Sequence, residues 1–237
     1  MVTHRFRSFS SWHSPVAAAA ALAALLFGAS PAGLAGTLTG SFASIAAGAN
    51  VDLTATGKLD WVQWGLYTAT SLNRKASVSP QISNFTLVGT AGNSQTAYQY
   101  ANNANGYTWY DGWPVAGVTN TTTGVWAYQY GTYSGYSDPV GSGFRITVPA
   151  GPTNEILLVY VGAYAAEGQL TASLSDGGSF TSTQAQTVNN LGSGPGGVFS
   201  LNFKANSPGQ TLTVTWKLAT AYDTSGGNVT LQAAALT

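Results

Sequence analysis

The feature that most constrains this chain is an alternation of apolar and polar residues, which recurs along most of its length. The clearest examples are residues 144–148, 170–174, 198–203 and 211–218. In the last of these, every second residue from Leu212 to Leu218 is apolar, and hydroxyls and Lys217 lie between them. Successive side chains of a β-strand point to opposite faces, so this pattern predicts antiparallel strands with one buried face.

Two further signals complete the prediction of the fold. Residues 156–161 are continuously apolar and rich in β-branched types, which is typical of a central strand covered on both faces. Glycine and proline turn signals separate the strand-like segments, at 149–152, 176–178, 192–197, 207–209 and 225–227. We therefore predict an all-β fold, an antiparallel β-sandwich of jelly-roll type. The final strand, 228–236, is expected to pair with an early one such as 36–43.

The first 35 residues have the composition of a secretory signal peptide. Arg5 and Arg7 precede an uncharged apolar run at 16–27, and small residues follow at 28–36. Cleavage after Ala32 or after Ala35 fits the small-residue pattern, and an uncleaved N-terminal anchor is the alternative. The run is short for a permanent membrane span. We expect a signal peptide at 1–35, one domain at 36–237, and a secreted, extracellular or periplasmic location.

Removal of this segment changes the chemistry that the chain can offer. It contains both histidines, His4 and His13, and the chain has no cysteine. A mature protein without His or Cys cannot form a Ser-His-Asp or Cys-His arrangement or an ordinary zinc site. Loss of Arg5 and Arg7 leaves six basic residues against eight acidic ones. Nucleic-acid binding needs a cluster of Lys and Arg that neutralises phosphates, so this class is excluded.

The middle of the domain is rich in aromatic rings and side-chain amides. Residues 98–136 hold eleven tyrosines and tryptophans among asparagines and glutamines, with Asp111 as the only charge. An aromatic surface with nearby amides and one carboxylate is suited to a sugar, which presents flat C–H faces and a ring of hydroxyls. The candidate ligand-binding residues lie in turn-like sequence: Trp109, Tyr110, Asp111, Trp113, Tyr133 and Tyr136. The alternative is that most of these rings simply pack within the sheets, above all those at strand spacing such as Tyr98 and Trp126.

Carboxylate chemistry is the remaining route to an enzyme. Glycoside hydrolysis needs two acids about 5 to 9.5 Å apart, and the candidates are Asp60, Asp111, Glu155 and Glu167. The sequence brings no two of them together, so we expect no catalysis and no cofactor. A structural calcium ion at isolated turn carboxylates, near Asp52, Asp176 or Asp223, is an alternative that the sequence leaves open.

Several segments in chain order resemble a known type of module. They are 57–65, which holds Asp60-Trp61-x-x-Trp64-Gly65, then 75–85, 107–112, 119–125, 143–150, 158–164, 170–177 and 209–216. Together they resemble a carbohydrate-binding-like or galactose-binding-like β-sandwich module of exported bacterial proteins, sometimes found beside glycoside hydrolases. The resemblance implies the sandwich fold and assigns no ligand residues. The Asp-Trp motif either binds a ligand or fixes a strand end through its indole N–H groups, and the second is favoured.

Three hypotheses for function follow from the sequence. The first is binding of a polysaccharide or cell-surface glycan through loop aromatics. The second is a structural or adhesive surface protein without a small-molecule site, and the third is a carboxylate-dependent glycoside hydrolase or lyase. Exposed tryptophans favour the first, an unpaired edge strand favours the second, and two carboxylates converging in a groove favour the third. The oligomeric state is not set by the sequence.

Overall fold

The computed structural model describes residues 1–2, 35–90, 94–130, 140–186, 196–223 and 226–237. The chain divides between Ala32 and Gly33, and the fold reported below is that of the unit that begins at Gly33. The expected signal peptide at 1–35 lies almost wholly outside the described residues. Within the described part, no helix is long and apolar enough to cross a membrane.

The fold is all-β, as predicted, and its one described helix is the single turn α1 (Leu53–Thr56). Nine of the described strands form the largest sheet. Seven of them follow the order β1 (Thr37–Ile45), β15 (Gly196–Lys204), β12 (Glu155–Tyr164), β17 (Asn228–Leu236), β3 (Asp60–Trp64), β4 (Leu72–Lys75) and β8 (Gly112–Trp113). β10 (Gly124–Tyr130) pairs with β17 and with β6 (Ser94–Tyr100).

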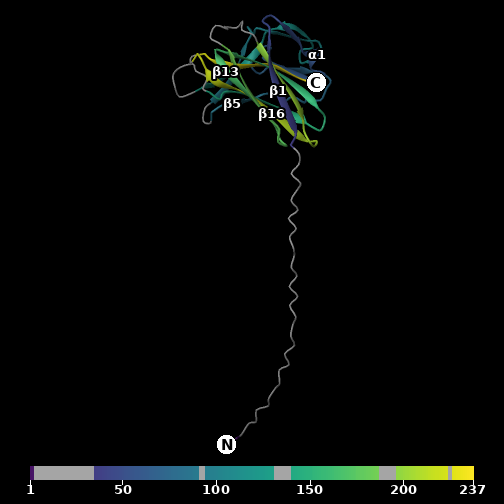
Figure 1. Cartoon of the computed structure of the whole chain (residues 1–237), viewed down its shortest axis with the longest axis vertical. Coiled ribbons are helices and arrows are strands. Elements are labelled where there is room, and N and C mark those ends of the chain that lie inside the picture. Colours follow the sequence, from purple (N-terminus) through teal and green to yellow (C-terminus); the bar gives the residue numbers. More distant parts are fainter. Residues whose placement is uncertain (3–34, 91–93, 131–139, 187–195, 224–225) are drawn as a thin grey trace. The chain divides into compact units, whose positions relative to one another are not determined.

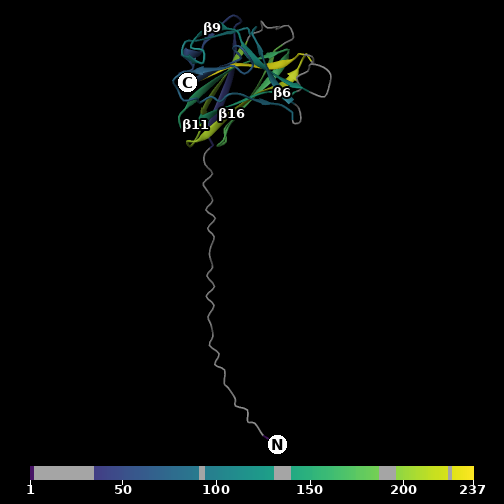
Figure 2. The same ribbon diagram turned by 180° about the vertical axis from the view of Figure 1, so that it is seen from behind.

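Two smaller sheets complete the described fold. The five-stranded one has the order β14 (Ser179–Gln186), β13 (Ala166–Leu174), β16 (Gln210–Ala221), β11 (Gly143–Ala150) and β5 (Thr86–Val88). Figure 2 shows β11 and β16 side by side in it. The three-stranded one is β2 (Asn50–Asp52), β7 (Gly106–Trp109) and β9 (Val118–Thr121). Every pairing is antiparallel except β2 with β7, which is parallel and departs from the prediction. No hairpin joins these two strands, so their direction is not fixed by a turn.

The apolar residues of the predicted alternating segments form much of the main apolar core. All four predicted segments are strands, in β11, β13, β15 and β16, and Leu212 to Leu218 are buried at every second position. Strands of both large sheets contribute to one apolar cluster. Its members include Val62, Leu157, Val159, Phe199 and Leu231 from the nine-stranded sheet and Phe144, Ile146, Leu170, Val214 and Trp216 from the five-stranded sheet.

β12 is a central strand with both faces covered, as its sequence predicts. It lies between β15 and β17 in the nine-stranded sheet. Leu157 and Val159 enter the main core, whereas Tyr160 packs on the opposite face in a second cluster. That second cluster also contains Leu53, Trp61, Tyr107 and Trp109. The sheet therefore separates two apolar layers, and its outer layer is built largely from aromatic rings.

The C-terminal strand pairs with an early strand, as expected, but the named example, 36–43, was wrong and the partner is β3. β17 lies between β12 and β3, and β1 pairs with β15 instead. The reason is burial on both faces: Ala233 and Ala235 belong to the outer cluster and Ala234 to the main core, so this strand fits only inside the sheet. The amide of Leu59 donates to the carbonyl of Leu236 at 3.0 Å, and Figure 1 shows the C-terminus beside α1.

Candidate ligand-binding site

The six residues predicted to bind ligand do not form one surface. Trp109 ends β7 with no exposed surface, and Trp113 ends β8 with 67% of its surface exposed. Tyr110 and Asp111 form the connection between these strands, and Tyr110 is 65% exposed. The predicted residues Tyr133 and Tyr136 lie outside the described residues.

Trp109 is a core residue, so the expectation of a loop position was wrong for it. Its ring packs on Trp61 with the centroids 5.4 Å apart, and its indole N–H donates to the carbonyl of Val115 at 2.9 Å. The turn signals of this segment refer to the residues that follow, and Trp109 completes the strand before them. A fully buried ring presents no face to a ligand.

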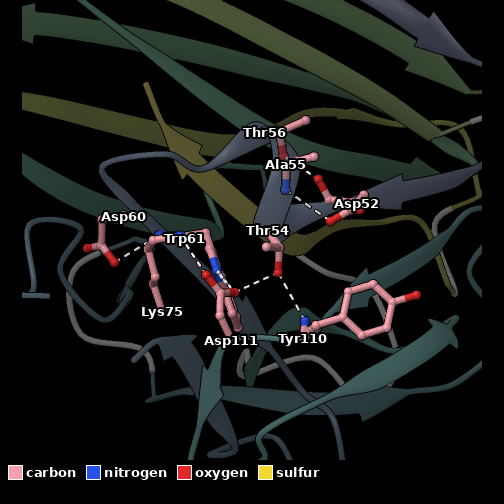
Figure 3. Close-up of polar contacts among 9 residues, drawn as sticks. All are labelled: Asp52, Thr54, Ala55, Thr56, Asp60, Trp61, Lys75, Tyr110 and Asp111. Carbon is pink, nitrogen blue, oxygen red and sulfur yellow. Dashed lines mark hydrogen bonds and ion pairs between the residues drawn. The ribbon is translucent and has the colours of Figure 1, made fainter. Parts of the chain in front are cut away.

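Asp111 lies at the centre of a polar network, drawn in Figure 3. One carboxylate oxygen accepts hydrogen bonds from the Thr54 hydroxyl at 2.6 Å and from the Trp61 indole N–H at 3.0 Å. The other forms an ion pair with Lys75 Nζ at 2.6 Å. The backbone N–H of Tyr110 donates to the Thr54 hydroxyl at 3.0 Å, and its ring projects away from the network. Asp111 thus fixes the connection between β7 and β8 to α1, β3 and β4.

The electrostatics of this network favour the ionised form of Asp111. Partial burial by itself would raise the pKa of the carboxyl. Hydrogen bonds from Lys75, Thr54 and Trp61, together with the positive charge of Lys75, outweigh that effect and hold the pKa below its ordinary value. Both oxygens are occupied within the protein, so Asp111 acts as a positioning residue.

The Asp-Trp-x-x-Trp-Gly motif has the structural role that the sequence favoured. The Asp60 carboxylate is fully buried and accepts hydrogen bonds from the backbone N–H groups of Trp61, Gln81 and Ile82, at 2.7 to 2.9 Å. The Trp64 indole donates to the Asn84 side chain at 2.9 Å. These contacts attach the segment at 81–84 to β3, and they leave neither indole free for a ligand.

Trp113 lies on the opposite face of the sheet from the Asp111 network. In the pairing of β4 with β8, Trp113 is directly opposite Arg74, and Gly112 is opposite Lys75. Consecutive strand residues point to opposite faces, and directly opposed residues share a face. Arg74 is also opposite Val62, which is part of the main core. Trp113 and Arg74 therefore share the face that looks toward the five-stranded sheet.

Arg74 also lines a groove of about 470 Å³. Its walls come from β4, from the segment at 80–83, from β11 and from the start of β16. The polar lining residues are Arg74, Gln81, Ser83, Thr147, Gln210 and Thr211. Pro80, Ile82 and Pro149 supply apolar surface. The hydroxyl of Ser83 accepts from the Thr147 N–H at 2.8 Å, which joins the two walls. Arg74, the cross-strand neighbour of Trp113, thus belongs to a groove lined by amides, hydroxyls and one guanidinium.

The aromatic pairs at strand spacing pack within the sheet, which confirms the alternative interpretation for Tyr98 and Trp126. They are cross-strand neighbours of β6 and β10, with ring centroids 5.0 Å apart and planes 26° apart. Such stacked pairs stabilise antiparallel strands. Their rings are part of the sheet surface and are remote in the strand order from β8.

The other candidate carboxylates are dispersed. Glu155 starts β12, and Glu167 accepts from the Thr220 hydroxyl at 3.3 Å on β13. Asp52 caps α1 by accepting from the Ala55 N–H, and Asp176 accepts from the Asn206 N–H. No three acidic, histidine or cysteine side chains gather around a common point within the described ranges. The suggested calcium positions therefore have isolated carboxylates in this part of the chain.

Sequence reasoning missed Arg74 and the groove. The residues that line it come from three parts of the chain, 74–83, 147–149 and 209–211, and no local motif connects these parts. Two signals were present: the turns at 149–152 and 207–209, and the adjacent basic residues Arg74 and Lys75 on a short strand. A strand period places these two side chains on opposite faces, and only the pairing with β8 shows which one lies beside a tryptophan.

No model of a known protein family matches the chain. No curated protein is similar to it in sequence.

Proposed function

We propose that this protein is an exported, non-catalytic glycan-binding protein that holds polysaccharide over Trp113 and the groove beside Arg74. The observation that carries the proposal is the position of Trp113. It is two-thirds exposed, and its cross-strand neighbour is a lining residue of the groove. Because large rings are usually buried, an indole left exposed beside a polar groove indicates a binding surface.

The chemistry of this surface fits a sugar chain. An exposed indole offers a flat apolar face on which the C–H face of a pyranose ring can stack. Gln81, Ser83, Thr147, Gln210 and Thr211 supply donors and acceptors for the ring hydroxyls. The groove is open to solvent, which suits an extended polymer better than a small enclosed ligand.

The elements beneath Trp113 support a site that is formed before the ligand arrives. β8 has only two residues and pairs with the edge of β4, so it would be weakly held on its own. The Asp111–Lys75 ion pair and the hydrogen bond from the Trp61 indole anchor the chain immediately before it. A platform held in this way loses little conformational entropy on binding.

The architecture that we propose is a β-sandwich of jelly-roll type. Support comes from the apolar cluster shared by the nine-stranded and five-stranded sheets, and from the antiparallel pairing within both. The proposal of export rests on the signal-peptide composition of 1–35 and on the scarcity of charged residues in the sequence.

Asp60 and Asp111 are both occupied by hydrogen bonds or an ion pair within the protein, which supports a binding role without catalysis. Asp60 is fully buried and saturated by three backbone amides, and Asp111 is paired with Lys75. Neither carboxyl is placed to protonate a glycosidic oxygen or to attack a sugar carbon. Among the described residues, those that line the groove include no acidic side chain.

The test is a quantitative pull-down of the mature domain, residues 36–237, on a panel of insoluble polysaccharides. Trp113→Ala should reduce binding about fivefold or more on the polysaccharide that retains the wild type, because loss of one stacked ring costs on the order of 1–3 kcal/mol. Tyr67→Ala is the matched control, since Tyr67 is 71% exposed and does not line the groove. Equal binding by the Trp113 variant, or no retention on any member of the panel, would overturn the proposal.

One observation favours the second hypothesis, a structural or adhesive protein. β14 has eight residues and pairs with β13 alone among the described strands, so one edge of it carries unpaired backbone groups. If this edge mediates assembly, the wild type should form concentration-dependent oligomers in sedimentation experiments. Thr183→Lys, a charge on an exposed position of β14, should then abolish them.

A further inference from the structure

Arg74 has spare hydrogen-bonding capacity at the wall of the groove. Its Nη2 donates to the carbonyl of Ile82 at 3.3 Å, a long contact. Its Nη1 is buried and has no partner within the described part of the chain. A guanidinium has five N–H donors in a planar fork, so most of its capacity is unused.

The positive charge of Arg74 is also uncompensated. The ion pair among the described residues is that of Lys75 with Asp111, on the other face of β4. Asp60 binds the same segment as Arg74, through the amides of Gln81 and Ile82, but it forms no ion pair with the guanidinium. A half-buried charge without a counter-ion is unfavourable, and a ligand that supplies one gains the energy of the pair.

The surroundings narrow down the chemistry of that ligand. The other polar side chains of the groove are neutral amides and hydroxyls, which match sugar hydroxyls and do not compete for the guanidinium. Trp113 is the cross-strand neighbour of Arg74 and is two-thirds exposed, so we expect its ring face to lie beside the same ligand. A ligand that contains a sugar ring, hydroxyl groups and an anionic group could stack on Trp113, form hydrogen bonds with the neutral polar side chains and pair with Arg74.

We infer that the groove selects polysaccharides whose sugars carry a carboxylate, that is uronic acid residues, and that Arg74 is the specificity-determining residue. This inference rests on the proposed function and names its ligand class. Arg74 lines the groove, and a carboxylate there would neutralise the charge of the guanidinium through charge-assisted hydrogen bonds, whereas a neutral hydroxymethyl group brings no counter-charge. Trp113 holds the sugar ring, and Arg74 sets the preference for the acid.

The experiment compares each acidic polysaccharide with a neutral form of the same backbone. Soluble polygalacturonate and alginate, each beside its esterified form, are titrated into the mature domain by calorimetry. We expect at least one acid form to bind about tenfold more tightly than its ester. Arg74→Gln should lower affinity for the acid form much more than affinity for the ester and so remove the preference, and Arg74→Lys should retain part of the preference because the positive charge remains. Arg145→Gln, an exposed arginine of β11 outside the groove lining, is the control.

The outcomes separate this inference from the proposed function. Equal affinity for acid and ester, or an Arg74→Gln variant that keeps the preference, overturns the inference. Binding confined to neutral polysaccharides and dependent on Trp113 would leave the proposed function in place and overturn the selection of uronic acids. Polyglutamate is the last probe: binding as tight as that of the best polysaccharide would show that the surface recognises charge without sugar and would overturn the inference. Circular dichroism of every variant checks that the fold is retained.

Discussion

Lys75 Nζ and Asp111 Oδ2 lie 2.6 Å apart, and this ion pair joins β4 to the residues immediately before β8. Trp113 and Arg74, the proposed binding pair, lie on the same two strands and on the opposite face. The network of Asp111 is therefore the support of the site, and its loss should affect both stability and binding.

The first prediction concerns Asp111→Asn. We expect the free energy of unfolding to fall by about 1–2 kcal/mol at pH 7, because the ion pair and two charge-assisted hydrogen bonds are weakened. The folded-state pKa of Asp111 lies below the ordinary value of 3.8, so its contribution is fully present above that value and is lost as pH falls through the folded-state pKa. Urea unfolding of wild type and variant should therefore converge between about pH 4 and pH 2. A difference that stays constant over this range would contradict the role assigned to the carboxylate.

The second prediction concerns Asp60→Ala. Three backbone N–H groups, those of Trp61, Gln81 and Ile82, would lose their acceptor in a site closed to solvent. We expect a loss of stability of about 3 kcal/mol or more, measured by urea unfolding. Asp52→Ala is the comparison, because Asp52 accepts one amide bond at the N-cap of α1 and should cost about 1 kcal/mol. Equal losses in the two variants would contradict the anchoring role of Asp60.

The third prediction is that Glu155→Gln stabilises the protein at neutral pH. Burial raises the pKa of the Glu155 carboxyl, and its Oε2 has no partner within the described part of the chain. The ionised form is therefore disfavoured in the folded state, and the penalty appears as pH rises through the raised pKa. The gain should be small, below about 1 kcal/mol, and should vanish at pH values under the ordinary pKa of 4.5. Glu167→Gln, which removes a carboxylate with a hydroxyl partner, should give no such gain.

The fourth prediction concerns Gly65, the last residue of the Asp-Trp motif. Its φ is +80°, and an added Cβ would lie 2.4 Å from the carbonyl oxygen of Gly124. Because the obstacle is backbone, Gly65→Ala should cost about 2 kcal/mol or more, through strain and displacement of β10. Gly151→Ala is the control, since a Cβ there meets nothing within 4 Å. A thermal unfolding midpoint of Gly65→Ala close to that of Gly151→Ala would contradict the constraint.

The regular strands could be predicted from the sequence because their periodicity reflects burial directly. β16 and β12 show the two kinds of pattern, alternating and continuous, and both lie where their pattern places them. Strand order could not be predicted in the same way. The alanines of β17 fit two apolar layers, and nothing in a run of small residues indicates which strands supply them.

The candidate site was predicted only in part, for a related reason. Trp109 and Trp113 lie in one short segment with the same turn residues, yet one is buried and the other exposed. Their difference depends on where β7 ends and on the packing partner Trp61, which is distant in sequence. Arg74 is part of the candidate site because it pairs with β8 and lines the groove together with β11. The sequence around Arg74 does not indicate either of these neighbours.

The most direct test of the central claim is a tryptophan fluorescence titration of the mature domain with soluble neutral and acidic polysaccharides. Trp61, Trp64 and Trp109 have no exposed surface and Trp216 is 2% exposed. Trp126 is half-buried, but it stacks on Tyr98 in β10, which is remote from β8 in the strand order. A ligand at the groove should therefore change the emission chiefly through Trp113. We expect a saturable change in the wild type that disappears in Trp113→Phe, whose ring still permits retention in a pull-down. A change that persists in Trp113→Phe, or no response to any polysaccharide of the panel, would contradict binding at this surface.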